Sequence, residues 1–118
     1  MSTALIRCLL AVLALSDNLE TVASKDVAQL LGVKRPTVHR ALALLQEKGL
    51  VQKALYSDVH LTPAGEALAR ELEAQRDGLF LLFLRRYGLS HEESLQSAFL
   101  LMHGLKKESL EKLLAQEE

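Results

Sequence analysis

Cationic and hydrogen-bonding side chains gather in one part of the sequence, residues 34–53. Arginine can donate two parallel hydrogen bonds to a guanine edge, threonine and histidine can donate to bases or phosphates, and lysine binds phosphate as a point charge. Residues 24–53 carry six cations and two anions, a net charge of +4, although the net charge of the whole chain is only −1. This concentration predicts contact with nucleic acid. The candidate residues are Lys34, Arg35, Pro36, Thr37, His39, Arg40, Lys48 and Lys53.

Two short helices with a tight joint are predicted to hold these side chains. The spacing of Val27, Leu30 and Leu31 predicts a first helix with one apolar face. Ser24 is expected to cap the beginning of this helix, because its hydroxyl can accept hydrogen bonds from free amides. Gly32 is expected to end it, because glycine tolerates a positive φ.

The second helix is predicted to begin near Pro36, whose missing N–H costs nothing in a first helical turn. One face of this helix is apolar, and the cations crowd its exposed first turns. This is the helix-turn-helix arrangement, in which the second helix enters the major groove of DNA. The apolar face consists of Val38, Ala41, Leu42 and Leu45.

A β-hairpin is predicted directly after the second helix, with strands at residues 50–55 and 59–61. A hairpin in this place is the wing of a winged helix. Asp58 near its tip would repel a phosphate, so the wing is expected to add little to DNA binding. Thr62 and Pro63 are expected to start the next helix, with the threonine hydroxyl as its cap.

The remainder of the chain is predicted to be helical, so the expected fold class is mostly α. A long helix should run from residue 63 to about residue 87, and Ser90 and Glu93 form a capping box for the next helix. Residues 79–84 are apolar on every side, which one small core could not bury. We therefore expect a homodimer with an interface that includes Leu79, Phe80, Leu82, Phe83 and Phe99.

The predicted organisation is a winged helix-turn-helix DNA-binding domain over residues 1–62 and an α-helical dimerisation domain over residues 63–118.

The apolar segment at residues 4–15 is too short to span a bilayer and is interrupted by Arg7, so we expect a cytoplasmic protein with no membrane contact. An enzyme is not expected, because no nucleophile–base set, paired carboxylates or glycine-rich phosphate loop has a suitable spacing.

Five stretches of the sequence together form a specific pattern, namely DVAQLLGVKRPTVHRAL, KGLV, VHLTPAG, FLLFLRRYGLSHEES and MHGL. With these motifs the sequence resembles the metal-dependent repressors of the DtxR/MntR type over most of its length. The resemblance implies a transcriptional regulator, in particular a repressor, that binds a palindromic operator as a homodimer. It also implies that the chain ends with the dimerisation domain and lacks the small extra domain of longer members. The alternative is a winged-helix subunit for protein–protein contacts that does not read DNA directly.

The resemblance also places the metal-ligand positions of the family on this sequence. They fall on Cys8, Asp77, Phe99, Met102 and His103, and only His103 keeps its expected identity. Manganese and iron sites need several carboxylates, so we predict that such sites are absent.

A narrower hypothesis is one transition-metal site built from Cys8, Asp77, Met102 and His103. Thiolate, thioether and imidazole ligands would favour a softer ion such as zinc or copper(I). The competing interpretation needs no metal: Cys8 and Met102 fill apolar space, Asp77 caps a helix, and His103 lies at a helix end, where the helix dipole favours it.

Overall fold

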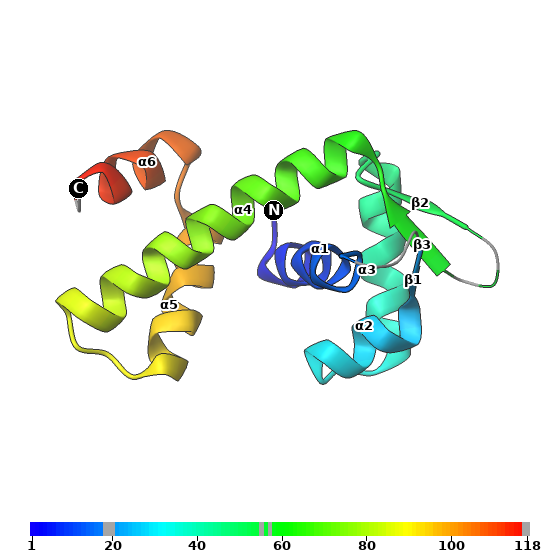
Figure 1. Ribbon diagram of the computed structural model, residues 1–118, viewed down its shortest axis with the longest axis horizontal. Helices are drawn as coiled ribbons and strands as arrows, with labels where there is room; N and C mark the ends of the chain where they lie inside the picture. Colours follow the sequence, from blue (N-terminus) through cyan, green and yellow to red (C-terminus); the bar gives the residue numbers. More distant parts are fainter. Residues whose placement is uncertain (18–20, 55, 57, 117–118) are drawn as a thin grey trace. The chain divides into compact units, whose positions relative to one another are not determined.

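The computed structural model describes residues 1–17, 21–54, 56 and 58–116 and has the predicted mostly helical winged-helix fold (Figure 1). Its contacts divide the chain into two compact units, Ser2–Arg70 and Glu71–Glu118, the second of which includes Met1. The helices are α1 (Thr3–Leu15), α2 (Ser24–Leu31), α3 (Arg35–Glu47), α4 (Pro63–Leu81), α5 (His91–Gly104) and α6 (Lys107–Ala115); the strands are β1 (Val22–Ala23), β2 (Val51–Lys53) and β3 (Asp58–Leu61).

The unit Ser2–Arg70 is built around α1. Ile6, Leu9 and Val12 of this helix are fully buried, and α1 packs against both α2 and α3. Burial of each such side chain contributes roughly 1.5–3 kcal/mol. Val38 and Leu45, on the apolar face predicted for α3, are fully buried as well. The core therefore fixes which face of α3 remains outside.

The predicted hairpin is confirmed, and it forms part of a three-stranded antiparallel sheet with the strand order β1-β3-β2. In the ladders, Val22 of β1 is opposite Val59 of β3, and Val51 of β2 is opposite Leu61. Figure 1 shows the β2–β3 hairpin extending from the end of α3 as the wing of the domain.

The joint between α2 and α3 also agrees with the prediction. Gly32 is the C-cap of α2 and has a φ of +68°, and its amide donates to carbonyl groups in the last turn of that helix. Pro36 lies in the first turn of α3. This local geometry needs no support from distant residues, which explains why the sequence pattern alone located it.

Two details predicted for α2 are wrong. Ser24 does not cap the helix, because Ala23 is the N-cap residue and makes no side-chain hydrogen bond there. The Ser24 hydroxyl is instead buried toward α3. The buried face of α2 consists of Ser24, Val27 and Ala28, whereas Leu30 is 54% exposed. The true i, i+3, i+4 face therefore begins at Ser24, so Leu30 falls outside it.

The wing is tied to the beginning of α4 by Thr62. Its hydroxyl accepts a hydrogen bond of 3.0 Å from the Gly65 amide, which confirms the predicted cap, and donates one of 2.6 Å to the Gly49 carbonyl. The Thr62 amide also donates to the Leu50 carbonyl at 3.1 Å. The chain that leaves the wing is thus held against the turn that follows α3.

The unit Glu71–Glu118 contains the second half of α4, which continues as a π-helical segment, η2 (Leu82–Arg86), and the helices α5 and α6. The Ser90 hydroxyl accepts from the Glu93 amide at 3.1 Å, so Ser90 is the predicted N-cap of α5. In the described part of the chain, none of the helices combines the length and the apolar character needed to span a membrane.

Candidate nucleic-acid interface

All eight side chains predicted to contact nucleic acid are exposed in the structure. Lys34 is the N-cap residue of α3, and the next five candidates lie in the first two turns of this helix. Lys48 is the C-cap residue at the other end of α3, about 12 Å farther along the helix axis than Arg40 at 1.5 Å per residue. Lys53 is the last residue of β2. The structure therefore gathers the candidates on α3 and extends them onto the wing.

The N-terminal end of α3 has a positive electrostatic potential from two sources. Its first turn contains no acidic residue, and the Lys34 side chain makes no capping hydrogen bond. Arg35 and Arg40 form no ion pair with any residue of the described ranges 1–17, 21–54, 56 and 58–116. The free amides of a helix N-terminus add a partial positive charge to these cations. This end of the domain is thus suited to bind a phosphate-rich surface.

His39 differs from the other candidates because one of its ring nitrogens is engaged within the domain. Its Nε2 atom lies 3.3 Å from the hydroxyl of the buried Ser24, so the side chain links α3 to α2. Lys53 lines the same small cavity of about 90 Å³. His39 therefore orients the two helices relative to each other, and only its Nδ1 side is left to face a ligand.

The tip of the wing carries an aromatic side chain rather than a cation. Tyr56 is 94% exposed and has a φ of +58°. Asp58 accepts a hydrogen bond of 3.3 Å from the Thr21 hydroxyl, which holds its carboxylate at the β1 side of the sheet. Tyr56 was not singled out from the sequence, because a lone aromatic residue between two predicted strands carries no periodic signal.

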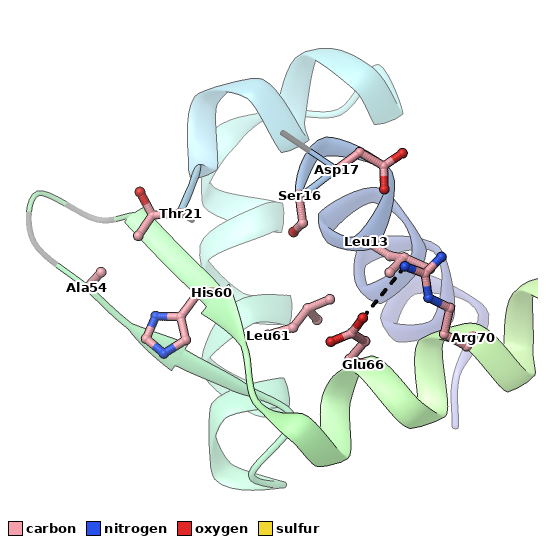
Figure 2. A pocket seen from close by; sticks show the side chains of 9 residues that line it. All are labelled: Leu13, Ser16, Asp17, Thr21, Ala54, His60, Leu61, Glu66 and Arg70. Atoms are coloured by element: carbon pink, nitrogen blue, oxygen red, sulfur yellow. Dashed lines mark ion pairs between the residues drawn. The ribbon is translucent and has the colours of Figure 1, made fainter. Parts of the chain in front are cut away.

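A wide depression of about 690 Å³ lies between the end of α1, the sheet and the start of α4 (Figure 2). Asp17, His60, Glu66 and Arg70 are its ionisable lining residues. Figure 2 shows the Glu66 carboxylate directed toward the Arg70 guanidinium, and the two groups are 3.6 Å apart. Because its charged groups include this ion pair, the depression has no single charge that would select a ligand.

The metal-ligand candidates have different environments. Cys8 of the unit Ser2–Arg70 is fully buried, and burial raises the pKa of its thiol to about 11, which disfavours the thiolate that a metal needs. In the other unit, Asp77 forms a 3.0 Å ion pair with Arg76, Met102 is buried, and the Nδ1 atom of His103 is 2.7 Å from the Met1 carbonyl oxygen. Within the described residues, no three His, Cys, Asp or Glu side chains form a group that could hold a metal. The soft-ion site stays a prediction.

The chain itself already covers part of the predicted dimer interface. Leu79, Leu82 and Phe99 are buried in the single chain, whereas Phe80 and Phe83 are half-buried. Phe80 makes an edge contact with His91 at a ring distance of 5.5 Å. The more accessible apolar side chains of this unit include Leu81, Tyr87, Leu95 and Leu100, none of which the prediction named.

Comparisons with known proteins agree with this architecture. The transcriptional regulator MntR of Salmonella typhimurium is 37% identical over 90 residues, which are 76% of this chain and 57% of that protein. The chain thus spans little more than half the length of the curated relatives it matches. The manganese regulator SloR has a similar structure, with a TM-score of 0.81 and 24% identity over 98% of this chain and 55% of that one. The hypothetical protein SSo2273 from Sulfolobus solfataricus has a TM-score of 0.73 and 21% identity over 98% and 88% of the two chains.

The fold, the exposed α3 surface and these likenesses define a winged-helix protein of the DtxR/MntR type. Residues 6–79 match the family model described as the HVO_A0261 N-terminal domain. The chain belongs to this domain family.

Proposed function

We propose that this chain is a DNA-binding transcriptional regulator that reads double-stranded DNA with α3. The observation that carries the proposal is the exposed N-terminal part of α3, where Arg35 and Arg40 have no ion-pair partner among the described residues. The related protein from Salmonella typhimurium is named as a transcriptional regulator, which supports the same role here. No catalytic activity forms part of this proposal.

In the proposed complex the side chains of α3 divide into two roles. Arg35, Thr37 and Arg40 contact base edges in the major groove, since arginine can bind guanine with two parallel hydrogen bonds. The lysines at positions 34, 48 and 53 bind phosphates, which position the protein without reading sequence.

We further propose that two copies of the chain bind a palindromic operator as a homodimer and act as a repressor. Two recognition helices related by a twofold axis contact successive major grooves, so the operator repeats the symmetry of the protein. The exposed apolar side chains Leu81, Leu95 and Leu100 support association through the helical unit, because their burial would remove apolar surface from water.

The proposal predicts a steep salt dependence of DNA affinity. A duplex selected from a random pool would be titrated with the chain, with fluorescence anisotropy as the readout. The association constant is expected to fall by at least roughly tenfold between about 50 and 200 mM salt, because each neutralised phosphate releases counterions.

Loss of this salt dependence would contradict the proposal. Failure to select any duplex, or binding that does not change with salt, would favour the alternative of a winged-helix subunit for protein contacts. In that alternative the cations of α3 would have no phosphates to neutralise.

The printed names of two structural relatives point to metal effectors, but the residues at the expected positions of this chain do not fit a manganese or iron site. SloR is named as a manganese regulator, and a solved structure of ScaR contains Zn²⁺. Here Phe99 cannot ligate, and the high thiol pKa of Cys8 opposes metal binding. We therefore propose DNA binding that requires neither manganese nor iron.

Treatment with a chelator tests this part of the proposal. Affinity for the selected duplex is expected to stay within about twofold after metal removal, and added Mn²⁺ or Fe²⁺ should not increase it, because the hard-ion ligands are missing. Metal analysis of the unmodified chain and of Cys8→Ser examines the soft-ion site. A stoichiometric zinc content that Cys8→Ser abolishes, together with lost DNA affinity in chelator, would show that the chain is metal-dependent after all.

A further inference from the structure

A cavity of about 280 Å³ lies beside the recognition helix, within the unit Ser2–Arg70. Its walls come from the first half of α1, the joint between α2 and α3, and the beginning of α3. Ordinary small-molecule pockets have volumes of roughly 300–1,000 Å³, so this cavity suits a ligand on the order of ten non-hydrogen atoms.

The lining combines apolar walls with a single charge. Ala4, Val33 and Val38 are among its apolar residues, and Arg7 is the only charged one among the described residues that line it. Arg7 already takes part in an interaction within the protein. A guanidinium has five N–H donors, so it can serve a ligand carboxylate in addition to that partner. The matching ligand therefore has an apolar body and one carboxylate.

The surface at this cavity exposes apolar side chains that a ligand would cover. Val33, in the joint between α2 and α3, is 41% exposed and lines the cavity. Leu31, another lining residue, is half-buried. Covering such surface is favourable in proportion to the apolar area removed from water.

We propose that this cavity binds a small apolar monocarboxylate and that its occupancy alters DNA affinity. Thr37 belongs both to the cavity lining and to the surface proposed to contact DNA, so a bound ligand lies in direct contact with the reading helix. The effect on DNA rests on the proposed function, whereas ligand binding itself does not.

The first experiment measures ligand binding to the full chain without DNA. Octanoate and benzoate are titrated while backbone amide NMR shifts are recorded, with benzamide as the uncharged counterpart of benzoate. We expect shifts at residues 3–8 and 31–41 with a Kd of roughly 0.1–1 mM for at least one carboxylate, a range typical of such small ligands. Benzamide should bind more weakly than benzoate.

Variants of α1 identify the site. Arg7→Gln should weaken carboxylate binding about tenfold through loss of a charge-assisted hydrogen bond, while Arg85→Gln, which changes an exposed arginine of the other unit, should not. Ala4→Leu should fill the cavity, and Ala14→Leu is the matched control because Ala14 is also exposed on α1 and does not line the cavity. Thermal unfolding of each variant verifies that it is folded.

Two NMR results would overturn the proposed site. The first is the absence of shifts with either carboxylate up to about 10 mM, a concentration well above the Kd expected for a ligand of this size. The second is equal affinity of the unmodified chain, Arg7→Gln and Ala4→Leu for the carboxylate.

DNA binding is then measured with and without octanoate. A change in affinity that Ala4→Leu abolishes would support the regulatory effect, and an unchanged affinity would refute that effect alone. Ligand binding by a chain that selects no duplex would refute the proposed function and leave the cavity as a ligand site.

Discussion

The Arg40→Ala variant is expected to bind the selected duplex about 5- to 150-fold more weakly than the unmodified chain, a loss of about 1–3 kcal/mol. Arg40 is exposed on the second turn of α3, and no acidic side chain of the described residues neutralises it. Truncation therefore removes a guanidinium that is directed to solvent in the free protein. The measurement is anisotropy at one fixed salt concentration.

Two further variants separate sequence reading from simple charge. Arg40→Lys keeps the charge but lacks the planar pair of donors, so it should retain the salt dependence and lose discrimination between duplexes. Arg85→Ala removes an exposed arginine from the unit Glu71–Glu118 and should leave affinity nearly unchanged. Equal affinities of Arg40→Ala and the unmodified chain would show that α3 is not the reading element.

The helix-turn-helix and the wing could be predicted from the sequence because their signals are local. Gly32 ends α2 with a positive φ, Pro36 lies in the first turn of α3, and Thr62 caps α4. Each of these residues acts on its neighbours within a few positions along the chain. The exposure of the cations on α3 then follows from the periodicity of its buried face.

Features that depend on packing between distant segments were harder to predict. The Ser24 hydroxyl is suited to an N-cap, but its hydrogen bond to His39 depends on how α2 meets α3. The apolar segment at residues 79–84 indicated a partner surface, yet Leu79 and Leu82 are buried by the chain itself. The cavity that Arg7 lines is equally invisible in the sequence, since its walls come from three helical segments.

Gly65 occupies a position where even a methyl group does not fit. A Cβ atom placed on it would lie 1.8 Å from the Leu50 carbonyl oxygen and 2.7 Å from the Leu50 carbonyl carbon. These are backbone atoms, so no side-chain rotation relieves the overlap. The same oxygen accepts the Thr62 amide hydrogen bond, and the Thr62 hydroxyl is bonded to the adjacent Gly49 carbonyl.

The Gly65→Ala variant should therefore lose about 3 kcal/mol of unfolding free energy, the upper end of what overpacking usually costs. The start of α4 would have to move away from Leu50, which would break the hydrogen bonds that hold the exit of the wing to the end of α3. Urea unfolding followed by circular dichroism measures the loss. Gly104→Ala is the matched control, because Gly104 is also helical and nothing lies within 4 Å of its added Cβ. That variant should be neutral or gain up to about 1 kcal/mol, as alanine favours a helix.

Equal urea midpoints for Gly65→Ala and the unmodified chain would contradict this prediction. They would mean that α4 does not begin against the Leu50 backbone. The wing would then lack its main anchor to the recognition helix.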